Sequence, residues 1–310
     1  MNLLQQTRQT ISDRLFTTAL ARHRCRMGWR DAPRYTKHWQ ACVKAMHDPL
    51  PQAGELAPAI EAFRRNGIAS FHTDETAAIA RSISARLAAR EAAGETVWQD
   101  DPETIGNNRY AGETWRDFPE LEGLFRGPLG TFLEHYFGCH FRIWFGLLYR
   151  NTPKKDARVG SQRWHSDSGP GSCVNVMFYL DETAPENGPL EALPWPDALE
   201  IFRGERAALR ASGGAHDTGG DRNGALYDYY GKVVAERYAE RVMQPAGPTG
   251  LVVPFLNNTL HRGGFPMPGH RRTAMVFHCY PGKAPTPYER YRREGLAKRG
   301  SYPKDPGETF

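Results

Sequence analysis

The stretch Gln162-Arg-Trp-His-Ser-Asp-Ser168 decides how this chain is interpreted, because it contains a His-x-Asp pair, His165 and Asp167. Residues i and i+2 of an extended strand point to the same side, so this imidazole and this carboxylate should face the same way. A second imidazole, His261, follows 94 residues after Asp167, behind an apolar stretch that reads as a strand. Two histidines and one carboxylate form the facial triad that holds Fe(II) and leaves three coordination positions open.

An arginine eleven residues after His261 extends this pattern. Arg272 should begin a strand, where its guanidinium can bind the far carboxylate of a keto acid chelated to the metal. Its neighbour Arg271 points to the opposite strand face, so the choice between them is a question of register. On the face of Arg272 lie Ala274, Val276 and His278. The spacing and the Arg-x-Ala pattern favour Arg272, and the whole pattern predicts an iron- and 2-oxoglutarate-dependent oxygenase.

Five further residues flank these positions and are candidate site residues. Asn175 and Tyr149 lie on expected strands near the ligands and are candidates for cosubstrate binding, although a satisfied strand amide explains Asn175 equally well. Gln162, Arg163 and Trp164 precede the first ligand and are candidates for substrate binding. For Trp164 a place in the hydrophobic core is the alternative.

The composition fits one large domain or two small ones, with 310 residues of which 40% are hydrophobic. The contents of Gly (31) and Pro (23) suit a loop-rich β architecture. The net charge of +5 is a mild excess and no nucleic-acid-binding signature is present, so we expect no nucleic-acid partner. Five cysteines without close spacing indicate a reduced, cytoplasmic protein. No stretch approaches the ~20 apolar residues of a transmembrane helix.

The order of the expected elements predicts helices that buttress a double-sheet jelly roll, also called a double-stranded β-helix and typical of cupins. Residues 1–55 should form a basic helical extension packed on the core, for which a membrane-surface role is the weaker alternative. Residues 56–310 should form the jelly-roll domain. Helices are expected at 35–46, 56–65, 74–93 and 119–137, and strands at 68–71, 140–149, 173–180, 250–255 and 272–280.

The glycine- and charge-rich segment 203–231 is expected to be a lid or an insertion, with a helix following near 232–243. As a lid it would order over the metal when substrate binds, and its arginines would meet an anionic group. The pair His216 and Asp217 in this segment imitates a ligand pair. It lacks the context of a strand, so we expect no metal there.

The chain resembles the phytanoyl-CoA hydroxylase-like branch of the 2-oxoglutarate oxygenases over about residues 140–282. The similarity extends back to about residue 60, whereas the first 50 residues lie outside it. One departure is Pro194-Trp-Pro196, which replaces the family's Pro-Gly-Ser-His. The matching motifs are Trp164-His-Ser-Asp167, Met177-Phe-Tyr-Leu-Asp-Glu-Thr-Ala-Pro-Glu-Asn-Gly-Pro-Leu-Glu-Ala-Leu-Pro194, Leu260-His-Arg-Gly-Gly264 and Gly269-His-Arg-Arg-Thr-Ala274.

The resemblance implies a jelly-roll core and a requirement for Fe(II), 2-oxoglutarate and O2. His165, Asp167 and His261 would be the metal ligands, and the reaction would hydroxylate or otherwise oxidise a small molecule while releasing succinate and CO2. Because the carboxylate of Asp167 fills the position that a halide would need, a halogenase is disfavoured. The alternatives are a zinc hydrolase and a non-catalytic protein that binds a small molecule, carbohydrate or lipid on the same scaffold. The substrate and the oligomeric state stay open, although the arginines leave room for an anionic substrate.

Overall fold

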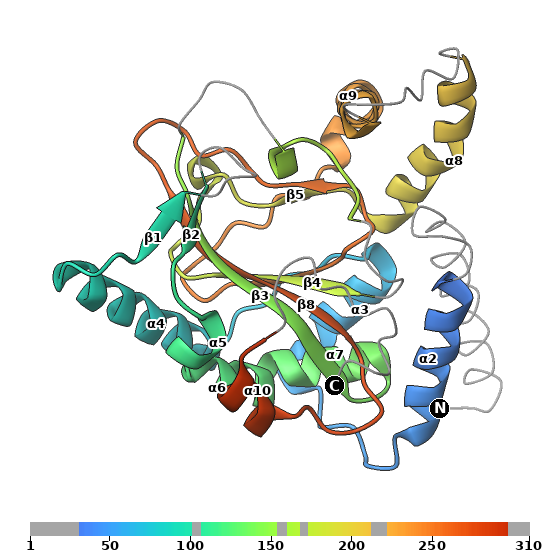
Figure 1. The fold of residues 1–310 in the computed structure, drawn as a ribbon. Helices are drawn as coiled ribbons and strands as arrows, with labels where there is room; N and C mark the ends of the chain where they lie inside the picture. Colours follow the sequence, from blue (N-terminus) through green and yellow to red (C-terminus); the bar gives the residue numbers. More distant parts are fainter. Residues whose placement is uncertain (1–30, 101–106, 154–159, 168–172, 212–221, 297–310) are drawn as a thin grey trace.

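The computed structural model describes residues 31–100, 107–153, 160–167, 173–211 and 222–296. Its centre is a six-stranded antiparallel sheet with the strand order β1-β2-β3-β8-β4-β6 (Figure 1). A second, two-stranded sheet pairs β5 with β7. The strands are β1 (Trp98–Asp100), β2 (Asn107–Tyr110), β3 (Phe141–Asn151), β4 (Val174–Tyr179), β5 (Glu191–Ala192), β6 (Val252–Leu256), β7 (His261–Arg262) and β8 (Arg272–Pro281).

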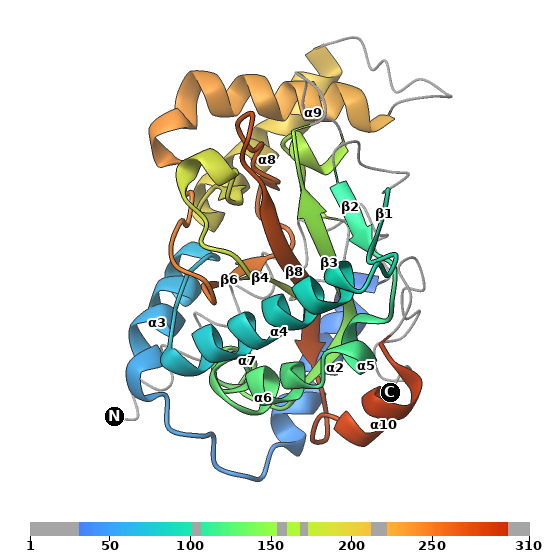
Figure 2. The same cartoon turned by 90° about the vertical axis from the view of Figure 1, so that its left-hand side faces the viewer.

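One face of the large sheet is covered by helices, as Figure 2 shows. The longer helices are α2 (Asp31–Ala45), α3 (Ala57–Asn66), α4 (Asp74–Ala92), α6 (Glu120–Arg126), α7 (Pro128–Phe137), α8 (Trp195–Ala211), α9 (Arg222–Val233) and α10 (Tyr288–Glu294). The short helical segments are η1 (Gly54–Leu56), α5 (Thr114–Asp117), η2 (Gly160–Gln162), η3 (Pro185–Asn187), η4 (Val234–Tyr238) and η5 (Ala239–Arg241).

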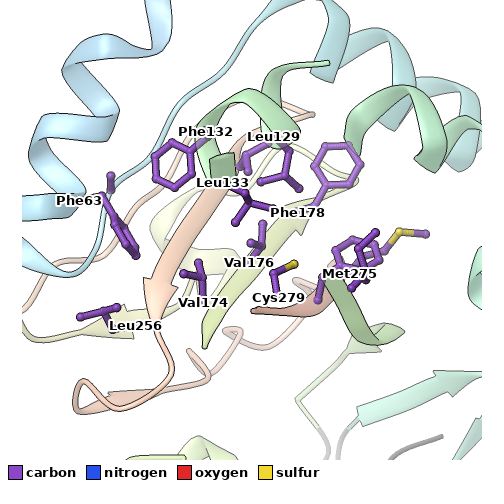
Figure 3. Close-up of a cluster of buried hydrophobic side chains, with 14 of the residues drawn as sticks. Phe63, Leu129, Phe132, Leu133, Val174, Val176, Phe178, Leu256, Met275 and Cys279 are labelled. Atoms are coloured by element: carbon purple, nitrogen blue, oxygen red, sulfur yellow. The ribbon is translucent and has the colours of Figure 1, made fainter. Parts of the chain in front are cut away.

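The alternation of side chains along the strands divides the interior into two layers. Val176 and Met275 point toward the helices and pack with Phe132 and other apolar side chains of α3, α6 and α7 (Figure 3). Met177 and Ala274 point to the other face, where they form a separate cluster with Leu190, Ala192 and other residues beside the small sheet. The sheet is therefore helix-covered on one side and faces β5 and β7 on the other, as the predicted jelly roll requires.

Local signals explain the helix boundaries. Thr73 caps α4 through a reciprocal capping box, because its hydroxyl accepts from the backbone of Thr76 while the Thr76 hydroxyl accepts from the backbone of Thr73. Gly67 ends α3 with φ 69°. A Cβ at Gly67 would lie 2.8 Å from a methyl carbon of Leu256, so only glycine fits this approach to β6.

The structure bears out the elements expected at 35–46, 56–65, 74–93 and 119–137, and the strands of the second half. The expected strand at 68–71 is reduced to two isolated bridges, Ile68 with Phe255 and Phe71 with Val252. The helix α2 packs on the domain, since the indole of Trp39 donates to the carbonyl of Phe137 at 2.7 Å. Residues 1–30 lie outside the described residues.

The described parts of the segment 203–231 are helical. Residues 203–211 continue α8, and residues 222–231 belong to α9. The helix expected near 232–243 begins earlier than predicted, because helical structure runs from 222 to 241. Burial explains the difference: Phe202 of α8 packs against Tyr230 of α9 with ring centroids 5.8 Å apart. Such packing outweighs the roughly 1 kcal/mol by which each glycine weakens a helix. Residues 212–221, including His216 and Asp217, lie outside the described ranges.

Within the described ranges, no helix combines the length and the apolar character that crossing a membrane requires. The cysteines of these ranges, Cys42, Cys139, Cys173 and Cys279, are buried and form no disulfide with one another.

Candidate metal centre and cosubstrate site

Backbone pairing brings the three predicted ligands together. His165 and His261 exchange two backbone hydrogen bonds of 2.9 Å, so these distant segments form one antiparallel bridge next to β5. The backbone of Asp167 donates to the carbonyl of Asn257 at 2.9 Å, which fixes the carboxylate at the same bridge. Nε2 of His165 lies 3.6 Å from Oδ1 of Asp167, and Nε2 of His261 lies 3.7 Å from Oδ2.

The three side chains fit a single metal ion, since one ligand atom from each lies within 4.8 Å of the others. Nδ1 of His165 lies 2.7 Å from the carbonyl oxygen of Arg163, and Nδ1 of His261 lies 3.0 Å from that of Thr259. Because a carbonyl only accepts hydrogen bonds, each Nδ1 carries the proton. Each Nε2 then keeps its lone pair on the side of Asp167, as in metal-binding histidines oriented by a second hydrogen bond.

Electrostatics keep this donor set ready for a cation. Burial lowers the pKa of His261 to about 4. The neighbouring His165 lowers this pKa further, whereas the charge of Asp167 raises it. Burial by itself would raise the pKa of Asp167, but the charges of His261, His165 and His278 and a hydrogen bond from Asn175 outweigh it, and the pKa falls. At neutral pH the site therefore presents a neutral His261 and a carboxylate, as Fe(II) requires.

A row of four cross-strand neighbours underlies the triad on the inner face of the large sheet: Phe145 pairs with His278, His278 with Asn175, and Asn175 with Phe255. Asn175 donates to Oδ2 of Asp167 at 2.7 Å. The ring of Phe255 lies 4.8 Å from that of His261. This row joins all strands of the sheet except β1 and β2 and supports two of the three ligands.

The sequence analysis predicted Asn175 as a site residue but did not predict that these four residues lie side by side behind the ligands. It placed His278 only on the same strand face as Arg272. A β-bulge between Ile143 and Phe145 lets two consecutive aromatic residues, Trp144 and Phe145, both lie against the ring of His278, at 5.7 and 5.3 Å. Bulges re-aim side chains next to functional sites. A sequence pattern in which successive side chains of a strand point to opposite faces cannot predict two neighbours on the same face.

Arg272 lies inside the protein with 1% of its surface exposed, whereas Arg271 is exposed. Its Nε and Nη1 have no hydrogen-bond partner among the described residues. Its guanidinium carbon lies 5.8 Å from the centre of the Tyr149 ring. A Cβ placed on Gly263 would lie 3.9 Å both from Nη2 of Arg272 and from Cγ of Gln162, so Gln162 lies beside the same space. A buried cation with vacant donors is costly unless an anion binds it.

The structure places the other predicted residues as follows. The hydroxyl of Tyr149 donates to Sδ of Met177 at 3.1 Å, in the inner layer. Trp164 belongs to the helix-side core, where the guanidinium of Arg262 lies 4.7 Å from its ring. Arg163 is partly exposed and pairs with Asp228 of α9. The structure thus brings Gln162, Tyr149 and Asn175 toward Arg272 or the ligands, and directs Trp164 away from them.

Two histidines, one aspartate and an inward-facing arginine inside a jelly roll are residues with which a protein can hold a metal ion and a keto acid. No family model matches the chain. In sequence it is 29% identical over 147 residues to L-proline trans-4-hydroxylase from Streptomyces griseoviridis. That match covers 46% of this chain and 54% of the relative, so the chain spans about half the length of the curated relative it matches.

Several solved structures align with this chain at TM-scores below 0.5. The non-heme alpha ketoglutarate dependent carbocyclase SnoK from nogalamycin biosynthesis aligns with a TM-score of 0.49 and 17% identity, over 75% of this chain and 87% of that one. EctD from S. alaskensis with bound Fe aligns with a TM-score of 0.47 and 18% identity, over 76% and 78%. HygX from Streptomyces hygroscopicus with nickel and 2-oxoglutarate bound aligns with a TM-score of 0.46 and 14% identity, over 73% and 87%.

Proposed function

We propose that this protein is an Fe(II)- and 2-oxoglutarate-dependent dioxygenase that hydroxylates or otherwise oxidises a small molecule, with release of succinate and CO2. The observation that carries the proposal is the buried guanidinium of Arg272, with vacant donors, in a jelly roll that also holds the triad. A dicarboxylate that chelates the metal at one end and reaches the arginine at the other supplies the missing anion.

In this proposal His165, Asp167 and His261 hold Fe(II), which would supply the activation of O2 and the decarboxylation of the keto acid. Arg272 binds the far carboxylate of 2-oxoglutarate while Arg271 stays outside. Tyr149 lies under the guanidinium and orients it. Its hydroxyl donates to the weak acceptor Sδ of Met177 in the structure, and a carboxylate oxygen of the cosubstrate would be a stronger acceptor.

Asn175 is proposed to orient the Asp167 carboxylate rather than to bind the keto acid, since its amide already donates to that carboxylate. Gln162 lies next to Arg272 and closes the cosubstrate end of the site. Trp164, as a core residue, supports the ligand segment from behind. Together these proposed roles cover the predicted site residues other than Arg163, and the burial of Arg272 would keep water away from the cosubstrate.

A zinc hydrolase on the same scaffold is the second candidate, and Arg272 argues against it. A hydrolase has no use for a buried cation whose Nε and Nη1 find no partner among the described residues, and burying such a cation without a ligand would only destabilise the fold. A non-catalytic binding protein is disfavoured by the same residue together with the ordered Nε2 atoms of the triad. We further propose a cytoplasmic location with no nucleic-acid partner, supported by four described cysteines that are buried and form no disulfide with one another and by the mild net charge.

The proposal is tested first by the binding of Fe(II) and 2-oxoglutarate and then by the oxidation of candidate substrates. Under anaerobic conditions, one equivalent of Fe(II) should bind, and subsequent addition of 2-oxoglutarate should produce the visible charge-transfer band of a chelated keto acid. In air, a panel of small molecules that includes L-proline is then scored by succinate release. Mass spectrometry of the product then shows whether it is hydroxylated, desaturated, cyclised or epoxidised. Stoichiometric Fe(II) binding without any 2-oxoglutarate binding would overturn the proposal in favour of another metal enzyme.

A further inference from the structure

Arg163 is joined to the metal site through its backbone and to α9 through its side chain. Its carbonyl accepts the hydrogen bond that orients His165. Its guanidinium pairs with the carboxylate of Asp228 and lies 5.3 Å from the centre of the Tyr227 ring. The ring of Tyr227 lies in turn 6.1 Å from the ring of His165, at 72° to it. One turn of α9 thus places a ring and a carboxylate around Arg163, directly beside a metal ligand.

The partner of Arg163 in this arrangement is easily replaced. The side chain of Asp228 is 79% exposed, whereas that of Arg163 is 28% exposed. Water screens an ion pair with so exposed a carboxylate, which makes the pair weak. The guanidinium itself stays oriented, because the face of Tyr227 holds it through a cation–π contact that does not depend on Asp228. Its planar fork suits two oxygens of a carboxylate or a phosphate.

We propose that Arg163 anchors an anionic oxygen group of the substrate, a carboxylate or a phosphate, and that Asp228 occupies this position until the substrate replaces it. The ring of Tyr227 lies close to both the guanidinium of Arg163 and the ring of His165, so the anchor lies beside a metal ligand. The substrate class is therefore a small molecule that carries a carboxylate or a phosphate group. This inference rests on the proposed oxygenase function and adds Tyr227 and Asp228 to the residues that select the substrate.

The chain contains a matched control for this arrangement. Arg237 pairs with the exposed Glu200 at 3.5 Å, and its guanidinium lies 5.5 Å from the ring of Tyr238. Like Arg163, Arg237 therefore has an acidic partner and lies over the face of a tyrosine. The proposal gives Arg237 no ligand. A general effect of an anion on arginine labelling will therefore appear at both residues, whereas binding of the anion at the proposed site will change the labelling of Arg163 alone.

The experiment labels arginines with phenylglyoxal in the full chain loaded anaerobically with Fe(II) and 2-oxoglutarate, and measures each site by peptide mass spectrometry. The probes are acetate and inorganic phosphate, with acetamide as the neutral control and sodium chloride holding the ionic strength constant. Either anion should slow the labelling of Arg163 and leave Arg237 unchanged. Protection by acetate alone assigns a carboxylate substrate, and protection by phosphate alone a phosphate ester. Equal labelling of Arg163 in all conditions overturns the proposal.

Two variants separate the role of Asp228 from that of a structural residue. Asp228→Asn should raise the labelling rate of Arg163 by about two- to fivefold, the factor expected when an exposed ion pair is removed. Glu200→Gln should do the same at Arg237, without any protection by anions there. An unchanged rate at Arg163 in Asp228→Asn means that Asp228 does not occupy the anchor. If Arg163 is protected but the wild-type protein binds no 2-oxoglutarate, the anion site stands and the oxygenase proposal fails.

Discussion

Asn175 donates a 2.7 Å hydrogen bond to Oδ2 of Asp167, the carboxylate oxygen that lies 3.7 Å from Nε2 of His261. The amide comes from the inner face of β4, whereas the carboxylate follows the bridge between His165 and His261. The large sheet therefore orients a candidate ligand that lies beside the small one. Since Asn175 also pairs across the sheet with His278 and Phe255, the position of the ligand depends on the register of three strands.

Removal of this amide should weaken metal binding without unfolding the protein. We expect Asn175→Ala to lower the Fe(II) affinity by roughly 10–100-fold, the effect of losing a hydrogen-bond partner behind a ligand. Anaerobic titration measures it. Asn187→Ala is the control, because that amide bonds to the carbonyl of Arg271 and contacts no ligand. Equal Fe(II) affinity in the wild type and Asn175→Ala would show that the carboxylate is held by its own backbone alone.

The three candidate ligands could be located from the sequence because their signal is local and chemical: His-x-Asp in an extended segment and a distant histidine after an apolar strand. An arginine at fixed spacing added to this signal. The helices and most strands followed from caps such as Thr73 and Gly67 and from apolar periodicity. The same reasoning separated the faces of β8, with Arg272, Ala274 and His278 together on one side.

The rest depends on contacts that no local pattern encodes. The bulge at Trp144 breaks the alternation of β3, and only its partner strand shows where the extra residue falls. The segment 203–231 was expected to be a lid or an insertion, and its glycines gave no sign that its described part is helical, which follows from the burial of Tyr230 against α8. The contact of Tyr227 with His165 joins residues 62 positions apart and arises only after α9 has docked.

The lowered pKa of His261 predicts how the stability of the metal-free protein depends on pH. Its pKa is about 4 in the folded protein and 6.5 in an unfolded chain, so the unfolded chain binds more protons between these values. The free energy of unfolding should therefore fall as the pH is lowered through this window. The loss should approach about 3 kcal/mol at the acidic end. Urea unfolding of the metal-free protein at a series of pH values measures the slope.

The matched variant for this prediction is His261→Gln, which keeps a polar side chain but cannot be protonated. Its stability should change less between pH ~6.5 and ~4 than that of the wild type. The lowered pKa of Asp167 has the same sign, since its stabilising contribution disappears only as the pH falls through its own low pKa. Equal slopes in both proteins would assign the acid sensitivity to other groups.

Each metal ligand should be necessary for binding one equivalent of Fe(II). We expect His165→Ala, Asp167→Ala and His261→Ala to abolish stoichiometric binding, because two remaining ligands do not define one face of the metal. Circular dichroism should show that each variant stays folded. Full Fe(II) occupancy with unchanged affinity in Asp167→Ala would remove that residue from the ligand set.

The two adjacent arginines should differ in their effect on 2-oxoglutarate. Arg272→Ala should weaken its binding by about 1.5–3 kcal/mol, the contribution of hydrogen bonds to a charged group. Arg271→Ala should leave the affinity unchanged, since Arg271 is exposed and Arg272 is buried. Titration of the charge-transfer band measures both. The reverse result would mean that β8 binds the keto acid from its other face.

The buried guanidinium of Arg272 also predicts a conflict between stability and function. In the protein without 2-oxoglutarate, Nε and Nη1 of Arg272 have no hydrogen-bond partner among the described residues, so burial of its charge is only partly offset by the Tyr149 ring. Methionine has a similar length and no charge. We therefore expect Arg272→Met to raise the free energy of unfolding by about 1–4 kcal/mol, as when buried charges are replaced by apolar side chains.

The same variant should lose the stabilisation that the cosubstrate gives. In the wild-type protein, saturation with 2-oxoglutarate and a redox-inert metal such as Ni(II) should raise the melting temperature, because the ligand binds only the folded state. In Arg272→Met the keto acid should add nothing beyond the effect of the metal. A variant that is less stable than the ligand-free wild type would show that the guanidinium contributes to the fold itself. A more stable variant that no longer binds 2-oxoglutarate would show that Arg272 is kept for its ligand.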